Sequence, residues 1–253
     1  MTEQDWLACT DSQKMLEFLM GKELYLSLRF GRKLRLFACA CCRRLWHMLI
    51  DERSRQAVKV AEAFADGLTS LEERRASYFQ VRDYIEEERR AFYVQVHGYA
   101  PDFAPYEAVA AAVSRRPFNG AVEASRWAAI AWGAAADADW PGLDDIEVGH
   151  RERDQERSRQ AALLPDIFGN PFRPVTISPT VLIWNDGVVV RLAQAAYEQR
   201  HLPEGTLDKS LLAILADSLE EAGCTDADTL GHLRGPGPHV RGCWPVDLCL
   251  GKS

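Results

Sequence analysis

The sequence predicts an all-α protein: a multi-helix bundle or helical-repeat-like body of about eight to ten helices, with a small C-terminal helical subdomain. Apolar residues recur at three- and four-residue spacing through most of the chain, which is the spacing of one face of an α-helix. Helix caps and helix breakers separate these runs, and almost no stretch alternates like a half-buried strand.

The helices of the first two thirds of the chain follow from their apolar stripes and their caps. The first begins at Asp11 or Ser12, either of which is a suitable N-cap. Segment 32–50 has only a narrow polar face, so a largely buried helix is expected there. Ser70 and Glu73 form a capping box that opens an unusually long helix. In chain order, the helices expected here span residues 11–20, 32–50, 54–66, 71–96, 105–116, 119–137 and 144–168.

Three prolines between Gly169 and Pro179 stop helix formation and predict a domain boundary. A helical body is expected at 1–168, a Pro-rich connecting loop at 169–179, and a helical subdomain packed on the body at 180–253. Within this subdomain, the apolar run 180–184 could form a short strand, but a lone strand has no evident partner. The helices expected after it span residues 187–200, 208–223 and 226–235.

Composition indicates a soluble, cytoplasmic protein without membrane association. Apolar residues make up 47% of the chain and charged residues 26%, which is close to an ordinary soluble protein. The N-terminal residues are acidic and polar, unlike a secretory signal. The longest apolar run, 127–136, is far shorter than the roughly 20 residues of a membrane helix. Seven cysteines, with Cys41 and Cys42 adjacent, fit a disulfide framework poorly and favour a reducing compartment.

The net charge of −7 is unevenly distributed along the chain. Between Arg29 and Lys59, nine basic residues accompany two acidic ones, so this segment carries +7 and the remainder −14. A basic segment can bind nucleic acid or an acidic partner. The alternative is neutralisation by acidic helices of the same chain, which the net charge favours because an acidic protein repels polyphosphate. The candidate binding residues are Arg32, Arg35, Arg43 and Arg44.

Two groups of cysteine and histidine residues are candidates for a zinc site. Cys39 and Cys42 are three residues apart, so they share a helix face. Near the C-terminus, His239 and Cys243 have the spacing of a ligand pair. A tetrahedral zinc ion needs four ligands, and these four residues supply them. The substitutes for any of them are Cys224 and His232.

Each of these segments also has a simpler interpretation. Free cysteine is often a small buried hydrophobe, and the segment 37–47 then is a packed helix; a redox or regulatory thiol is a further alternative. The glycine-rich loop 235–242, with Arg234, Arg241 and His239, could cradle a phosphate. It matches no P-loop or dinucleotide fingerprint, however. The alternative is a tight turn that holds the tail in place with Trp244 as its apolar plug.

Three stretches together resemble a family of uncharacterised bacterial proteins that occur as many paralogues in large genomes. They are "RKLRLFACACCRRLWH", "DIFGNPFRPV" and "ILADSLEEAGCTDADTLGHLRGPGPHVRGCW". The portion "LADSLEEAG" also resembles the start of the repeat-companion domain, whose core has tryptophan where this chain has Ser218. The resemblance implies a class of protein and assigns no catalytic residue.

These observations favour a non-enzymatic helical protein that binds other proteins as an adaptor. No nucleophile or metalloprotease motif is present, so catalysis is not expected, and no cofactor is expected apart from zinc. The alternatives are a zinc protein, structural or hydrolytic, built on the cysteines and histidines, and a nucleic-acid binder that uses the segment 29–59.

Overall fold

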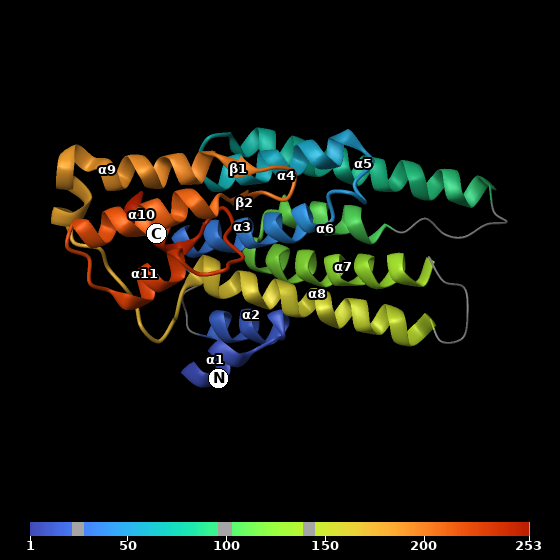
Figure 1. The fold of residues 1–253 in the computed structure, drawn as a ribbon. Coiled ribbons are helices and arrows are strands. Elements are labelled where there is room, and N and C mark those ends of the chain that lie inside the picture. The colour runs from blue at the N-terminus through green and yellow to red at the C-terminus, as the bar shows by residue number, and fades with distance from the viewer. Residues whose placement is uncertain (22–27, 96–102, 139–144, 253) are drawn as a thin grey trace. The chain divides into compact units, whose positions relative to one another are not determined.

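The computed structural model describes residues 1–21, 28–95, 103–138 and 145–252 (Figure 1), and it confirms the all-α class. These residues form twelve helices and one two-stranded antiparallel ribbon, β1 (Arg200–His201) and β2 (Thr206–Leu207). The helices are α1 (Glu3–Ala8), α2 (Ser12–Gly21), α3 (Leu28–Arg44), α4 (Glu52–Ala65), α5 (Leu71–Gln95), α6 (Ala104–Ala112), α7 (Pro117–Ala138), α8 (Asp145–Phe168), α9 (Pro179–Glu198), α10 (Lys209–Glu221), α11 (Ala227–Leu233) and α12 (Trp244–Cys249). The short helices α1 and α12 were not expected from the sequence.

The chain divides into two compact units. The larger unit comprises residues 9–161, and the smaller unit comprises residues 1–8 together with 162–253. The division therefore falls within α8, a few residues before the boundary predicted at 169–179. Helix α1 belongs to the smaller unit because Glu3 accepts a hydrogen bond from Asn170 at 2.7 Å and pairs with Arg173 at 2.6 Å.

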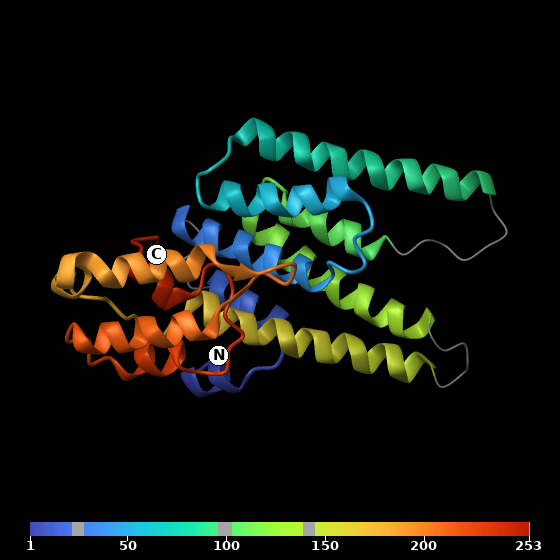
Figure 2. The same ribbon diagram turned by 45° about the horizontal axis from the view of Figure 1, so that its top comes forward.

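Helix α3 is the centre of the larger unit, where it packs against α4, α6 and α7 (Figure 1). Helix α4 lies between α3 and α5 (Figure 2). The cap and the capping box predicted from the sequence are confirmed: Asp11 accepts from the backbone of Gln13 at 3.0 Å, and Ser70 and Glu73 exchange backbone-to-side-chain hydrogen bonds at 2.9 and 3.1 Å.

The cysteine helix α3 is packed, as its narrow polar face predicts, but it ends at Arg44 and not at the predicted residue 50. Cys39, Cys41 and Cys42 on α3 are each at most 1% exposed and lie in the core of the larger unit. Burial raises the pKa of the Cys41 and Cys42 thiols well above the ordinary value. Both thiols are therefore neutral, apolar core groups at physiological pH.

The positive charge of the segment 29–59 is largely neutralised inside the larger unit. Arg43 forms a bidentate pair with Glu62 at 2.5 and 2.8 Å, and both side chains are buried. Arg32 pairs with Asp66 at 2.9 Å. Arg35 is buried and donates to the backbone carbonyls at the end of α6. Acidic side chains of the same unit thus neutralise Arg32 and Arg43, which is the alternative that the net charge favours.

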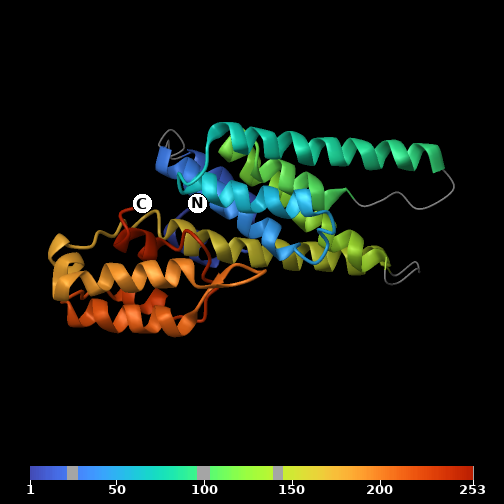
Figure 3. The same ribbon diagram turned by 90° about the horizontal axis from the view of Figure 1, so that it is seen from above.

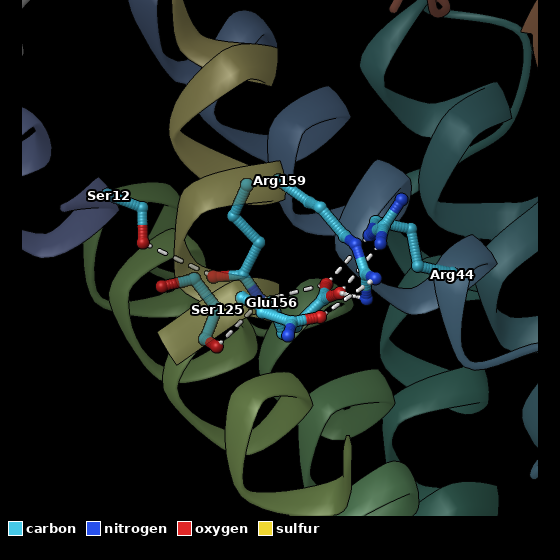
Figure 4. Close-up of polar contacts among 7 residues, drawn as sticks. Ser12, Arg44, Ser125, Glu156 and Arg159 are labelled. Carbon is cyan, nitrogen blue, oxygen red and sulfur yellow. Dashed lines mark hydrogen bonds and ion pairs between the residues drawn. The ribbon is translucent and has the colours of Figure 1, made fainter. Parts of the chain in front are cut away.

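Arg44, the fourth candidate for nucleic-acid contact, instead anchors a buried polar network (Figure 4). It forms two hydrogen bonds of 2.7 Å with Glu156 of α8, whose side chain is fully buried. Arg159 approaches the same carboxylate at 3.9 Å. Gln160 extends the network, since it donates to Glu156 at 3.3 Å and accepts from Ser12 of α2 at 3.2 Å. The network links α2, α3 and α8.

In the smaller unit, α9 and α10 lie side by side and antiparallel, joined by the β1–β2 ribbon (Figure 3). Helix α11 packs on α10, and α12 packs on α9. The strand considered at 180–184 does not form, because residues 179–183 are the helical start of α9 and Trp184 already has extended φ and ψ. The helix is kinked directly afterwards, where Asn185, Asp186 and Gly187 adopt positive φ. A strand here would also need a partner strand, and the unit offers none among its described residues.

Replacing Arg44 with methionine tests the buried network. The change leaves the Glu156 carboxylate buried without its bidentate partner, so we expect the larger unit to lose about 3 kcal/mol of stability. Lys59→Met is the matched control, because Lys59 pairs with the exposed Glu52 alone among the described residues, and its loss should cost at most about 1 kcal/mol. Urea unfolding followed by circular dichroism compares the two. Equal losses would show that the buried pair contributes no more than a surface pair.

Candidate metal centre

Four side chains of the smaller unit converge on one point: Asp166, His232, His239 and Cys243. One ligand atom from each lies within 4.8 Å of all the others. Asp166 Oδ1 is 2.9 Å from His232 Nε2 and 3.0 Å from His239 Nδ1. Cys243 Sγ is 3.4 Å from the same His232 nitrogen and 3.9 Å from the same His239 nitrogen. Among the described residues, this is the group whose donors could hold a metal ion.

The four residues come from three elements of the smaller unit. Asp166 lies in the last turn of α8, and His232 lies in the last turn of α11. His239 belongs to the loop between α11 and α12, and Cys243 is the N-cap residue of α12. Asp166, His239 and Cys243 are at most 4% exposed, and the His232 side chain is 21% exposed. The site is therefore largely buried, and His232 is the most exposed of its four residues.

The loop that carries His239 and Cys243 is held in place on both sides. The backbone N–H of Leu207 in β2 donates to the His239 carbonyl at 2.8 Å. Gly237 has φ +86° and approaches His239 so closely that a Cβ would lie 3.0 Å from its backbone nitrogen, which only glycine avoids. Trp244, next to Cys243, packs against Gly169 at the end of α8, where a Cβ would lie 3.3 Å from its ring. Trp244 is thus the apolar plug expected from the sequence.

The second polar atom of two ligands is also bound, which fixes the orientation of each. Asp166 Oδ2 accepts from the Val240 backbone N–H at 2.9 Å, so Oδ1 alone faces the imidazoles. His239 Nε2 is 3.3 Å from the Gly235 carbonyl, which can only accept, so Nε2 carries a proton and Nδ1 faces the centre. Metal-binding histidines characteristically donate their other N–H to a carbonyl or carboxylate in this way.

The geometry differs from that of a catalytic cysteine–histidine–aspartate relay. In such a relay the imidazole uses one nitrogen for the nucleophile and the opposite nitrogen for the carboxylate. Here Nε2 of His232 faces both Asp166 and Cys243, and Nδ1 of His239 also faces both. Cys243 is fully buried, so its sulfur is not presented to a substrate. Convergence of all four groups on one point is instead an arrangement that could hold a metal ion.

Burial and mutual contact set the ionisation of the group. Burial raises the pKa of the Cys243 thiol well above its ordinary value, and the nearby Asp166 charge raises it further. Burial alone would raise the pKa of Asp166, but hydrogen bonds from His232 and His239 bring it below the ordinary value. Burial likewise opposes the charged form of His239, whose pKa is nevertheless raised by Asp166. A cation at the centre would favour the thiolate that burial disfavours.

The ligands predicted from the sequence are divided between the units. His239, Cys243 and the substitute His232 lie together in the group of four. Cys39 and Cys42 lie in the other unit, in the core of α3. The other substitute, Cys224, lies outside the group, and its charge contributes instead to the raised pKa of Cys249, after the larger effect of burial.

Asp166 is the ligand that sequence reasoning missed. A signal was present, because "LLPDIF" places a lone carboxylate among apolar residues at the end of a helix, where a buried charge needs partners. Ligand spacing among cysteines and histidines alone does not reveal this carboxylate, which lies 66 residues before His232.

The two arginines of the possible phosphate site in loop 235–242 also form contacts within the protein. Arg234 pairs with Asp217 at 2.7 Å and with Glu220 at 2.5 Å. The guanidinium of Arg241 lies over the Tyr197 ring at 5.0 Å. Together with the inward orientation of His239, these contacts favour the alternative interpretation of the loop as a turn that holds the tail in place.

Comparison with protein-family models, with curated proteins and with solved structures found no match to this chain. None of the described helices has both the length and the apolar character needed to cross a membrane.

The Asp166–His239 pair predicts a particular pH dependence in protein treated with a chelator. A carboxylate with a lowered pKa stabilises above its unfolded pKa of about 3.9, and an imidazole with a raised pKa stabilises below its unfolded pKa of about 6.5. The second contribution is lost as the pH rises through the raised pKa of His239. We therefore expect the melting temperature to be highest between about pH 4 and pH 6.5.

Thermal melts from pH 3 to pH 9, recorded for this protein and for Asp166→Asn, measure the effect. The substitution removes the carboxylate charge and should flatten the decline above about pH 6.5. A melting temperature that rises steadily to pH 9 in the chelator-treated protein would contradict the assigned pair.

Proposed function

We propose that this protein is a zinc-binding helical protein, in which Asp166, His232, His239 and Cys243 hold one structural zinc ion. The observation that supports this most directly is the convergence of four different ligand atoms on one point of the smaller unit. Zinc accepts one carboxylate oxygen, two imidazole nitrogens and one thiolate sulfur in a four-coordinate site. The mixed set of one thiolate and two imidazoles suits zinc better than magnesium or calcium, which prefer oxygen ligands only.

Charge balance supports a divalent ion. The Asp166 carboxylate and a Cys243 thiolate together carry two negative charges, and two neutral imidazoles add none. A divalent cation makes the buried group neutral overall, so the cost of burying each charge separately is avoided. Binding must release the proton from the Cys243 thiol, which is neutral at ordinary pH because burial raises its pKa.

A structural role is favoured over a hydrolytic one. A catalytic zinc ion keeps an open position for water or substrate, whereas four protein ligands fill a tetrahedral site. Three of the four ligands are at most 4% exposed, which leaves little access for a substrate. The ion would join the end of α8, the end of α11 and the 235–243 loop. The adaptor role expected from the sequence stays a prediction.

Ligand substitutions should separate this site from the one predicted from the sequence. We expect Cys243→Ser and His239→Ala to lose stoichiometric zinc, and Asp166→Asn to bind it at least 10-fold more weakly. Cys249→Ala and Cys39→Ala are matched controls, since both remove a buried thiol outside the group and should keep one zinc per chain. Zinc is counted by competition with a chromogenic chelator after purification without an affinity metal.

Cobalt substitution provides a second measurement on the same variants. Cobalt in the full chain should give the visible absorption of a four-coordinate ion and a near-ultraviolet thiolate band that Cys243→Ser removes. Chelation should lower the melting temperature of the smaller unit by about 10 °C, which corresponds to a few kcal/mol for a chain of this size. Retention of zinc by Cys243→Ser and its loss from Cys39→Ala would overturn the assignment and favour the cysteine helix.

A further inference from the structure

We propose that the larger unit contains a binding site for a small phosphorylated molecule with an aromatic ring, of which a purine nucleotide is the simplest example. The site is a cavity of about 610 Å³ between the start of α5 and the turn that joins α6 to α7. Pockets for small ligands typically measure about 300–1,000 Å³. All its lining residues belong to the unit 9–161, so the proposal does not depend on the zinc site.

The wall of this cavity is strongly basic, although the chain as a whole is acidic. Four arginines line it, and no acidic side chain does; they are Arg74, Arg75, Arg115 and Arg116. Among the described residues, no carboxylate lies within 4.0 Å of the guanidinium of Arg75, Arg115 or Arg116. Most arginines of the segment 29–59, by contrast, are paired with glutamate or aspartate. The positive charge of these arginines is therefore available to bind an anion.

The basic wall is supported by buried groups. Arg74 is 3% exposed, its Nη1 donates to the Val113 carbonyl, and its buried Nε has no hydrogen-bond partner. Arg35 is 4% exposed and donates to the Ala112 carbonyl at 2.6 Å. Both guanidiniums lie over the Phe64 ring, at 5.1 and 5.3 Å. Two buried cations thus hold the C-terminal end of α6, where the helix dipole favours them, and fix the turn that follows.

These buried arginines also show that the wall carries an excess of positive charge. Burial lowers the pKa of Arg74, and the like charges of Arg75 and Arg115 lower it further. Burial lowers the pKa of Arg35 to about 10, with Arg74 again contributing. Helix α7 starts beside the cavity and has no acidic residue in its first turn, so its dipole adds to the positive potential. A bound phosphate would relieve this repulsion.

A second, smaller cavity adjoins the first, and its lining includes aromatic and acidic side chains. Tyr78, Ser114 and Asn119 also line a second cavity of about 270 Å³, which includes Trp127 and Glu123. Aromatic rings at this end can stack on a base, and a carboxylate can accept a hydrogen bond from its amino group. A ligand that spans both cavities therefore carries phosphate at one end and a nitrogen-bearing ring at the other.

A small molecule fits these observations better than a nucleic acid. The four arginines surround one cavity of small-molecule size, whereas a nucleic acid is bound by a row of basic groups along a surface. The arginines of the segment 29–59 that could have extended such a row are engaged with Asp66, Glu62 and Glu156.

Isothermal titration of the full chain at physiological salt tests the site with ADP, pyrophosphate and adenosine. We expect ADP to bind more tightly than pyrophosphate, and adenosine to bind weakest, because the two ends of the cavity act together. The double variant Arg75→Gln, Arg115→Gln should weaken ADP binding at least 10-fold, since each charged hydrogen bond contributes roughly 1.5–3 kcal/mol. Both side chains are exposed, so the fold should be unchanged.

Arg90→Gln is the matched control, because Arg90 is an exposed arginine of the same helix, α5, outside the cavity. It should leave ADP affinity within twofold. Three results would overturn the proposal: no binding of ADP at about 1 mM, equal weakening by Arg90→Gln and by the double variant, or binding of a single-stranded oligonucleotide but not of ADP. Any of these results would show that the arginines contribute only non-specific positive charge or bind a different partner.

Discussion

The Asp166 carboxylate, buried among apolar residues of the smaller unit, is the constraint on which the account of this molecule depends. A buried charge must be paired or must coordinate a cation, and here its partners are two imidazoles, one backbone N–H and a nearby thiol. To supply them, the end of α8, the end of α11 and the 235–243 loop must meet. The glycine at 237 and the packing of Trp244 on Gly169 follow from the same requirement. Four ligand groups of three chemical types meet at one point, which is more than an ion pair needs and is compatible with the proposed zinc ion.

Buried charges in the larger unit are also paired, but mostly in ion pairs between arginine and glutamate. Most of its inward-facing arginines have carboxylate partners, as in the pairs Arg43–Glu62 and Arg44–Glu156 (Figure 4). These pairs turn a run of positive charge in the sequence into internal contacts between helices. The arginines around the α5 cavity depart from this pattern, because Arg74 donates to a backbone carbonyl and lies near the like charges of Arg75 and Arg115. This difference within one unit is the basis for the proposed ligand site at the α5 cavity.

The sequence predicts the fold better than the site, for physical reasons. Helical periodicity and caps are local, so Asp11, the Ser70–Glu73 box and most of the buried helix predicted at 32–50 could be located in advance. The apolar run 180–184 could not be assigned from its residues alone, because five apolar residues fit a strand and a helix equally well, and its neighbours decide. The tail ligands His239 and Cys243 were found from their spacing. Their partner Asp166 lies far away in the sequence, so only the fold could bring it there.

The most direct test of the zinc assignment is the elemental metal content of the full chain, purified without an affinity metal and measured by mass spectrometry. We expect one zinc per chain, retained on dialysis at pH 7.5 and released as the pH falls to about 5, where protons compete for the thiolate and imidazoles. A chain that carries no metal, and whose melting temperature is unchanged by added zinc or by chelator, would contradict the account. The four side chains would then form a hydrogen-bonded polar cluster that stabilises the tail by itself.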